Sequence, residues 1–363
     1  MGARGSWKNS KIFRVGAASV AVLGVAAGAL YYTGTFERWR DGRAVSQACG
    51  GIVPQGELEE YLGVGRLTSR QAWESNARDD RRCSISTRVG EEKGRFGWLK
   101  VNLGRGKSSR DLLTDLARTE SYAFGPFVTP IGNGWRGVLG NFTTPYSVAT
   151  VVVRCGGEAR DDLAVNVQAM ARMGGSSKDT RTPEQRARFA RIVTQTAANA
   201  AKQAGCEVPS GRDIKTVPDV PPNAPTPAGK GTGTCAGINA PTYETTADPL
   251  APIEDCIMAD KKGQGRFRLA AYYGPFVEKG TAKVSLRDFV FTKRANGTEG
   301  AYWTSTACPK QGGTAFFSAE TLRDGDRLTE PDPAAQQAAL KHFAERSARS
   351  HGCTLNFAKP PTN

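Results

Sequence analysis

Eight cysteines are the residues of this chain whose number and spacing point most directly to a chemistry. They are Cys49, Cys83, Cys155, Cys206, Cys235, Cys256, Cys308 and Cys353. No two of them form the Cys-x-x-Cys pair that is common in zinc sites, so a zinc site is not expected. The even number instead predicts four disulfides, which form in oxidising compartments outside the cytoplasm.

The two histidines offer little material for catalysis or metal binding. His342 and His351 lie nine residues apart on one predicted helix. Nine steps of about 100° place them on opposite faces, so they cannot bind one metal together. His351 continues an apolar stripe and is expected to be packed near the helix end. A Ser-His-Asp triad or a Cys-His pair is therefore not predicted.

Acidic residues occur in adjacent pairs, which are Glu59-Glu60, Asp79-Asp80, Glu91-Glu92 and Asp161-Asp162. Adjacent side chains point apart, whereas a glycosidase-like reaction needs two carboxylates facing across about 5 to 10 Å. Solvated turns are the expected role of these pairs. Asp324-Gly325-Asp326 lacks the ordered oxygen spacing of a calcium loop and also predicts a turn.

Two glycine-rich segments resemble nucleotide-binding loops in part of their residue pattern, but neither meets all the requirements of such a loop. Gly132 to Gly137 matches G-x-G-x-x-G, but a strand rather than a helix is expected after it, whereas the dinucleotide fingerprint requires a helix. Gly104-Arg-Gly106-Lys107-Ser108 lacks the first glycine of a phosphate loop, because Val101 stands there. The sequence therefore predicts no catalytic, cofactor-binding or metal-binding residue.

The stretch from Val15 to Thr33 has nineteen residues without a charge, and it separates a short basic N-terminal tail from the rest of the chain. A helix of about 20 residues crosses a hydrocarbon core of about 30 Å. Arg4, Lys8, Lys11 and Arg14 precede it without an acid, which predicts a cytoplasmic N-terminus (residues 1–14) and an exported C-terminal part. The alternative is a secreted protein whose signal peptide is cleaved near Ala27-Gly28-Ala29.

The formal net charge is +14, and neither exported half holds a strongly basic block beside stacking aromatic residues. Nucleic acid is therefore not an expected partner. Residues 209–233 contain six prolines and few large apolar side chains, which predicts a partly extended linker. Residues 34–45 are a juxtamembrane segment, residues 46–208 and 234–358 are two domains, and residues 359–363 are a disordered tail.

The two halves follow one plan, in which a second cysteine precedes a Gly-Arg-Phe triplet and an alternating strand. The triplets are Gly94-Arg95-Phe96 and Gly265-Arg266-Phe267. Alternation at Leu99, Val101 and Leu103, and at Phe267, Leu269, Ala271 and Tyr273, predicts half-buried strands. Arg95 and Arg266 are expected at equivalent places. A capped helix is also expected near Leu112, within Ser108 to Pro145.

Each half then has a third cysteine closing a strand and a helix ending in Gly-Cys. Thr182-Pro183-Glu184-Gln185 and Asp332-Pro333 are helix starts, and Gly205 and Gly352 predict left-handed C-terminal turns. The predicted fold is α+β, with an N-terminal transmembrane helix and two tandem, duplicated, disulfide-stapled domains. Each domain is expected to be an antiparallel sheet with a packed C-terminal helix.

The order of these elements predicts the disulfides Cys49–Cys83, Cys155–Cys206, Cys235–Cys256 and Cys308–Cys353. If each half folds alone, four cysteines allow three pairings per half. The first two cysteines bracket a short opening segment, and the last two join a strand end to the helix packed on it. Replacing Cys206 or Cys353 with Ser is then expected to unfold its own half and spare the other.

The run from Cys49 to Gly63, CGGIVPQGELEEYLG, followed by Cys83 at the head of a strand, resembles the opening of small exported actinobacterial envelope domains. The whole chain is similar to single-span membrane proteins of streptomycetes. The resemblance implies a disulfide-stapled α+β fold and brings no site residues with it.

These observations favour a membrane-anchored envelope module that binds a partner protein, a wall polymer or a small ligand. An exported hydrolase using carboxylates alone is the first alternative, and two facing acids in a cleft, one with a raised pKa, would favour it. A sensor or accessory subunit is the second alternative. Its signal would have to pass through the membrane helix, since fourteen cytoplasmic residues are too few for a signalling domain.

Overall fold

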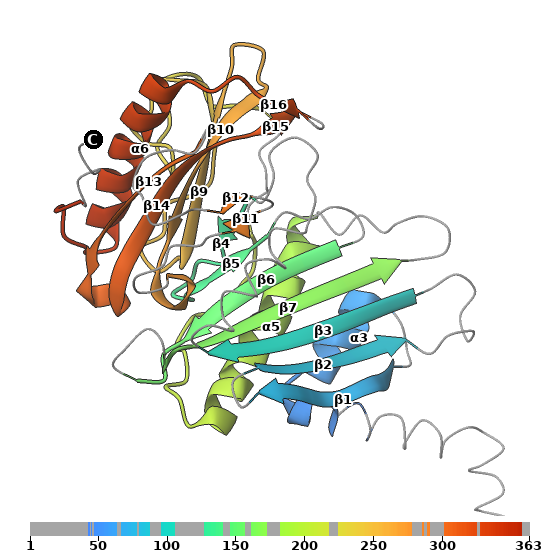
Figure 1. Ribbon diagram of the computed structural model, residues 1–363. Helices are drawn as coiled ribbons and strands as arrows, with labels where there is room; N and C mark the ends of the chain where they lie inside the picture. The colour runs from blue at the N-terminus through green and yellow to red at the C-terminus, as the bar shows by residue number, and fades with distance from the viewer. Residues whose placement is uncertain are drawn as a thin grey trace, which may run out of the picture.

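The computed structural model describes residues 43, 45, 47–63, 67–77, 80–87, 96–105, 127–140, 146–156, 161–172, 182–217, 224–277, 285–286, 289–290, 301–324 and 327–357. Within these residues the chain is an α+β protein with two larger antiparallel sheets, each accompanied by a long helix (Figure 1). The predicted fold class is confirmed at this level.

The first sheet has seven strands in the order β1-β2-β3-β7-β6-β5-β4, all paired antiparallel. Their bounds are β1 Leu67–Ala77, β2 Asp80–Thr87, β3 Phe96–Arg105, β4 Thr129–Pro130, β5 Gly137–Leu139, β6 Tyr146–Val153 and β7 Leu163–Arg172.

Alternating apolar residues bury one face of this sheet. Leu99, Val101 and Leu103 on β3 belong to a single core, together with Val165 and Val167 on β7. Since successive side chains of a strand point to opposite faces, the residues between them lie on the other face. The half-buried strand predicted from the alternation is confirmed.

Helix α5 (Pro183–Ala204) covers the apolar face of the first sheet. Its N-cap Thr182 accepts a hydrogen bond from Gln185 N at 3.2 Å, and Gly205 closes it with φ 66°, as predicted. The short helix α3 (Gln55–Leu62) packs beside α5 through Tyr61, whose ring centroid lies 5.5 Å from that of Phe189.

The second sheet has five strands in the order β13-β14-β10-β9-β8. Their bounds are β8 Thr242–Glu244, β9 Ile253–Ala259, β10 Gly265–Tyr272, β13 Ala301–Cys308 and β14 Gly313–Thr321; two short hairpins are β11 Ser285–Leu286 with β12 Phe289–Val290, and β15 Arg323–Asp324 with β16 Arg327–Leu328.

Helix α6 (Pro333–Ser350) packs its apolar stripe on the second sheet. Asp332 caps its N-terminus by accepting from Ala335 N at 3.0 Å, and Leu340, Phe343 and Ala344 are buried. The N-cap and the buried stripe predicted from the sequence are both confirmed.

The two halves share one strand order. The first half reads β1-β2-β3-β7-β6 followed by α5, and the second reads β8-β9-β10-β14-β13 followed by α6. In each half the second cysteine lies on the strand beside the central strand, where Cys83 of β2 pairs with Val101 of β3 and Cys256 of β9 with Leu269 of β10. Val101 and Leu269 therefore occupy corresponding positions.

This register corrects the alignment of the Gly-Arg-Phe triplets. Phe96 and Phe267 lie in the corresponding strands β3 and β10. Phe267 belongs to the core under α6. Phe96 is three positions before Leu99 on the same strand, so its side chain points to the opposite face, away from α5. Counting from Val101 and Leu269, the residue that corresponds to Phe267 is Leu99. Gly94 and Arg95 lie outside the described residues.

All four predicted disulfides are present. They are Cys49–Cys83, Cys155–Cys206, Cys235–Cys256 and Cys308–Cys353, and the described part of the chain contains no free cysteine. In each half, one disulfide joins the opening segment to the sheet and the other ties the end of the long helix to a strand end.

The halves are joined by a buried apolar cluster to which both sheets contribute. Val138, Val148 and Val152 of the first half meet Ile253 and other residues of the second, on the sheet faces turned away from α5 and α6. Figure 1 accordingly shows the second sheet against the β4–β6 end of the first, with α6 on its outer side. The two halves therefore share a buried apolar interface and are not connected by the linker alone.

The proline-rich segment 209–233 is attached to both halves. Ile214 and Val217 are buried in the first core, and Arg186 Nε donates to Val217 O at 3.0 Å. Near its other end, Thr226 pairs with Thr242 of the second half. The composition of the segment predicted a spacer because prolines and polar residues outnumber the apolar side chains, such as Ile214 and Val217, that attach it to the core.

Several predictions concern residues outside the described part of the chain. They are the anchor at 15–33 with the preceding tail 1–14, the helix expected near Leu112, and the tail 359–363. Among the residues that the structure does describe, no helix is both long and apolar enough to cross a membrane. The anchor and its orientation stay predictions.

Candidate functional site

The face of the first sheet opposite α5 carries polar and aromatic side chains on three neighbouring strands. The register places Trp98, Met170 and Tyr146 in one row across β3, β7 and β6. Lys100 and Gln168 form the next row, and Asn102, Asn166 and Thr150 the third. We call these eight residues the amide–aromatic face. The third row is its inner row, and the five residues of the first two rows together form its outer row.

Its inner row is a hydrogen-bonded ladder centred on the fully buried Asn166. Asn166 Oδ1 accepts from Asn102 Nδ2 and from Gln168 Nε2, both at 3.3 Å. Asn166 Nδ2 donates to Thr150 Oγ1 at 2.9 Å. Because a buried amide without partners destabilises a fold, this closed ladder fixes the side chains of the row.

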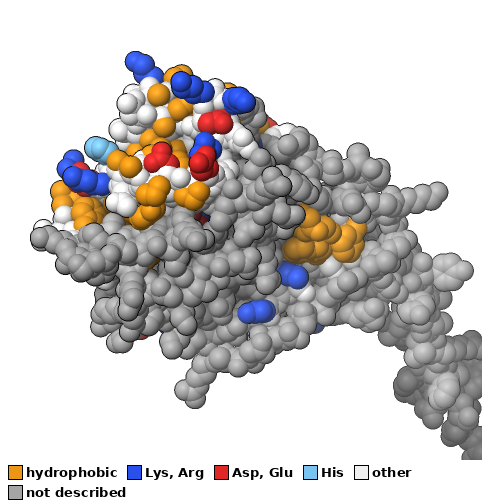
Figure 2. All heavy atoms as spheres, turned by 45° about the horizontal axis from the view of Figure 1, so that its top comes forward, with side chains coloured by type: hydrophobic (Ala, Val, Ile, Leu, Met, Phe, Trp, Pro, Cys, Tyr) orange, Lys and Arg blue, Asp and Glu red, His pale blue; other side chains and the backbone are white. Residues whose placement is uncertain are grey.

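The outer row is accessible to solvent. Tyr146 is 43% exposed, Trp98 is half-buried, and their ring centroids lie 6.1 Å apart. The exposed Lys100 places Nζ 5.2 Å from the centre of the Trp98 ring. Figure 2 shows a group of hydrophobic side chains with basic side chains beside it, apart from the mixed-charge surface at the top.

Three polar groups of this face have no hydrogen-bond or ion-pair partner among the described residues. Within the described part of the chain, no carboxylate lies within ion-pair distance of the Lys100 ammonium, and no hydrogen bond reaches Gln168 Oε1 or the Tyr146 hydroxyl. The face therefore offers a cation, a hydrogen-bond acceptor, a hydroxyl and two aromatic rings. None of the eight residues forms a nucleophile–base pair with another of them.

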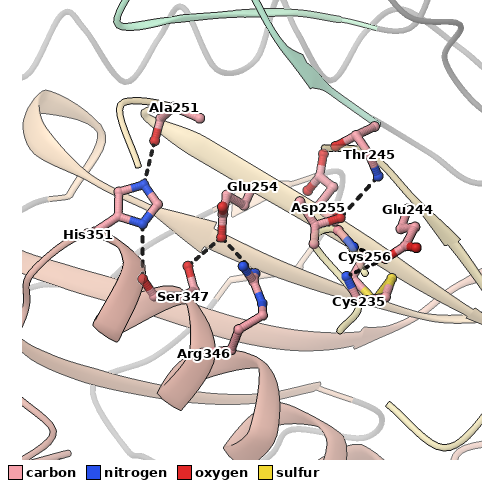
Figure 3. Close-up of polar contacts among 12 residues, drawn as sticks. Cys235, Glu244, Thr245, Ala251, Glu254, Asp255, Cys256, Arg346, Ser347 and His351 are labelled. Atoms are coloured by element: carbon pink, nitrogen blue, oxygen red, sulfur yellow. Dashed lines mark hydrogen bonds and ion pairs between the residues drawn. A yellow bond between two sulfur atoms is a disulfide. The ribbon is translucent and has the colours of Figure 1, made fainter. Parts of the chain in front are cut away.

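A second polar cluster lies between the second sheet and α6 (Figure 3). Glu254 Oε2 accepts from Ser347 Oγ at 2.5 Å and from Arg346 Nη2 at 2.7 Å. The Ser347 hydroxyl also lies 2.5 Å from the Tyr273 hydroxyl. Desolvation by burial raises the pKa of Tyr273, and the nearby Glu254 charge adds to this.

Ser347, His351 and Glu254 are the residue types of a catalytic triad, but their bonds are wrong for one. His351 Nδ1 faces the backbone carbonyl of Ser347, and Nε2 faces that of Ala251, each at 3.0 Å (Figure 3). Neither ring nitrogen of His351 faces the serine hydroxyl, so the histidine is not placed to act as its base. His351 is only 2% exposed and stacks on Tyr273 at 3.8 Å, so it is packed as predicted, while His342 is exposed on the other side of α6.

A third cluster lies on the opposite face of the second sheet, which is the face turned toward the first half. Arg268 is buried between two acids, with Nη2 2.5 Å from Asp255 Oδ1 and Nη1 3.9 Å from Glu320 Oε2. Asp255 Oδ2 also accepts from Val128 N of the first half at 2.9 Å. This cluster connects the two halves electrostatically.

Burial dominates the acid–base properties of this cluster. Desolvation raises the pKa of Asp255 to about 6, against the opposing effect of the Arg268 charge. Burial also raises the pKa of Glu320. The two carboxyl groups lie on either side of a guanidinium instead of across an open cleft, and Asp255 is completely buried. This arrangement does not provide the facing acids that the hydrolase alternative requires.

The other sequence candidates lie apart from one another. Glu60 forms a surface ion pair with Arg188 at 3.2 Å. The buried Asp162 accepts from Cys155 N at 3.3 Å, and burial raises its pKa. Gly132 to Gly137 forms the turn between β4 and β5, with no helix after it, as predicted. Asp324 lies in β15, and Gly325 and Asp326 are outside the described residues.

Sequence reasoning missed the amide–aromatic face because it followed only the buried alternation. The signal was present in the intervening positions, since Trp98, Lys100 and Asn102 alternate with Leu99, Val101 and Leu103. In the described ranges no group of three or more His, Cys, Asp or Glu side chains is placed to hold a metal ion.

Comparison of the chain with protein-family models, with curated proteins and with solved structures finds no match to any of the three.

Proposed function

We propose that this protein is a non-enzymatic binding module of the cell envelope. In this proposal residues 15–33 anchor it in the membrane with the N-terminus in the cytoplasm, and both halves lie outside. The charge asymmetry around residues 15–33 supports the orientation. The four disulfides support an oxidising compartment.

The amide–aromatic face is the observation that carries the proposal. Exposed aromatic rings that are fixed by a rigid sheet give contact area at little cost in conformational entropy. Beside them, Lys100 and Gln168 offer polar groups that can orient a ligand. A sheet face that presents its groups in rows suits an extended polymer better than a small molecule, which is typically enclosed in a pocket.

We further propose that the two halves arose by duplication and that only the first retains a ligand surface. The shared strand order, the equivalent disulfides and the matching helices support this. In the second half the equivalent sheet face is buried against the first, through the cluster around Ile253. The resemblance of Cys49 to Gly63 to exported actinobacterial domains points to the same cellular setting.

Cosedimentation of the full chain with purified bacterial cell walls tests the proposed function. We expect the protein to pellet with the walls and to be released by soluble wall polymer. Walls stripped of their accessory polysaccharides serve as the control. Failure to pellet with any wall preparation would contradict the proposal.

A further inference from the structure

The sheet register allows the two halves to be compared residue by residue. Counting from Val101 and Leu269, Lys100 corresponds to Arg268 and its neighbour Gln168 corresponds to Glu320. Both halves thus place a cation on the central strand, on the sheet face turned away from the long helix. The two cations differ in what surrounds them.

In the second half the cation is neutralised inside the protein. Arg268 is 3% exposed and lies against the carboxylates of Asp255 and Glu320. In the first half the positions of these acids hold other residues. Gln168 stands in place of Glu320, and Arg82 stands in place of Asp255. The first half therefore keeps the cation and lacks both anions that neutralise its counterpart.

The exposed Lys100 also lies over an aromatic ring. Its ammonium is 5.2 Å from the Trp98 ring centre, and Tyr146 extends the aromatic row on the neighbouring strand. Aromatic rings favour the flat apolar faces of sugar rings, while the ammonium favours an anionic substituent at the ring edge. The acceptor Gln168 Oε1 and the Tyr146 hydroxyl can bond sugar hydroxyl groups.

We infer that the outer row of the amide–aromatic face binds an anionic polysaccharide, whose negative groups give Lys100 the neutralising charge that Asp255 and Glu320 give Arg268. This inference rests on the proposed function and adds the chemical class of the ligand. A nucleic acid would also meet aromatic rings and positive charge, but it requires basic residues along the path of its backbone. Here Lys100 is the one cation in the aromatic and amide rows of β3, β7 and β6, and the exposed Arg82 on β2 lies beside the inner row rather than along the aromatic one.

Titration of the full chain with polygalacturonate, followed by calorimetry, tests the inference. Dextran serves as the neutral polysaccharide, and polyphosphate and a single-stranded oligonucleotide serve as polyanions without a suitable sugar acid. We expect polygalacturonate to bind at least about tenfold more tightly than any of these, with an affinity that falls as salt increases.

The most specific variant is Gln168→Glu. It puts a carboxylate beside Lys100, at the position where the second half has Glu320 beside Arg268. It is expected to weaken polygalacturonate binding at least about tenfold, whereas Gln195→Glu, the same exchange at an exposed site on α5, leaves it unchanged. Tyr146→Ala is expected to weaken binding to a similar extent. Its control is Leu355→Ala, because Leu355 is also 43% exposed. Thermal unfolding identifies any variant that is destabilised, and Trp98→Phe is the milder change in the aromatic row.

The possible failures are distinguishable. If the chain binds polygalacturonate but Gln168→Glu and Tyr146→Ala bind it as well as the unchanged chain does, the assigned surface is wrong. If polyphosphate or the oligonucleotide binds equally well through the same residues, the saccharide class is wrong. In both cases pelleting with cell walls still supports the proposed function. Loss of wall binding as well would overturn both proposals.

Discussion

Removing the guanidinium of Arg268 should destabilise the protein more than any exchange at its surface. In Arg268→Ala, Asp255 loses its partner at 2.5 Å and keeps only the Val128 N–H at 2.9 Å. Glu320 loses a weaker contact at 3.9 Å and keeps the Ser318 hydroxyl at 2.9 Å. Breaking a buried ion pair by removing one partner costs about 3 to 5 kcal/mol, so we expect a loss of this size at pH 7.5.

Urea unfolding of the full chain, followed by circular dichroism and tryptophan fluorescence, measures this loss. Arg349→Ala is the matched control, because the Arg349 side chain is 66% exposed and its pair with Glu345 spans 3.9 Å. We expect the control to cost less than about 0.5 kcal/mol. At pH 5 the loss in Arg268→Ala should be smaller, since the buried acids can then take up protons. A loss below about 1 kcal/mol at pH 7.5 would refute the reasoning.

Three further predictions follow from the fold. Burial raises the pKa of Asp255 from 3.8 to about 6, so the native state holds this proton more tightly than the unfolded chain does. The free energy of unfolding should therefore fall by up to about 3 kcal/mol as pH rises from about 4 to about 6. Urea titrations at several pH values measure this slope, and Asp255→Asn should remove it. The double variant Cys155→Ser/Cys206→Ser opens a loop spanning 51 residues, so the free energy of unfolding should fall by about 4 kcal/mol and the urea midpoint should be lower. Because both sheets share the cluster around Ile253, the second half should be destabilised too. A second half that unfolds at an unchanged urea concentration would contradict this. Phe189→Ala empties a fully buried site between α5 and Tyr61 and should cost about 3 to 5 kcal/mol by the same assay, whereas a cost near that of Arg349→Ala would show that the site is not packed as described.

The elements of each half were predictable because local patterns determine them. Thr182 and Asp332 cap helices with their own side chains, and the alternation at Leu99 and Val101 follows from the period of a strand. The disulfide pairing followed from the order of these elements. These signals need only neighbouring residues, or the sequence order of strands and helices.

The association of the halves was not predictable by the same means. Val151, Val152 and Val153 form a continuous apolar run, which is typical of a strand buried on both faces, but the run does not name what covers its second face. The same holds for Asp255 and Arg268, whose pairing depends on the register of β9 with β10. The expectation that each half folds alone left out this shared surface.

The amide–aromatic face was hidden for a related reason. Trp98, Gln168 and Tyr146 are far apart in the sequence, and only the register of three strands puts them in neighbouring rows. A search for catalytic motifs passes over such residues because none is a nucleophile, base or metal ligand in this setting. Their chemistry is apparent only once the sheet has been assembled.

Hydroxyl-radical footprinting of the full chain, with and without polygalacturonate, tests the binding surface most directly. Trp98 and Tyr146 are reactive aromatic side chains at the exposed end of the amide–aromatic face, and both should be oxidised several-fold more slowly when the polymer is present. The exposed residues His342 on α6 and Leu355 should be oxidised at unchanged rates. Equal oxidation of Trp98 and Tyr146 with and without bound polymer, or protection confined to the second half, would contradict the account.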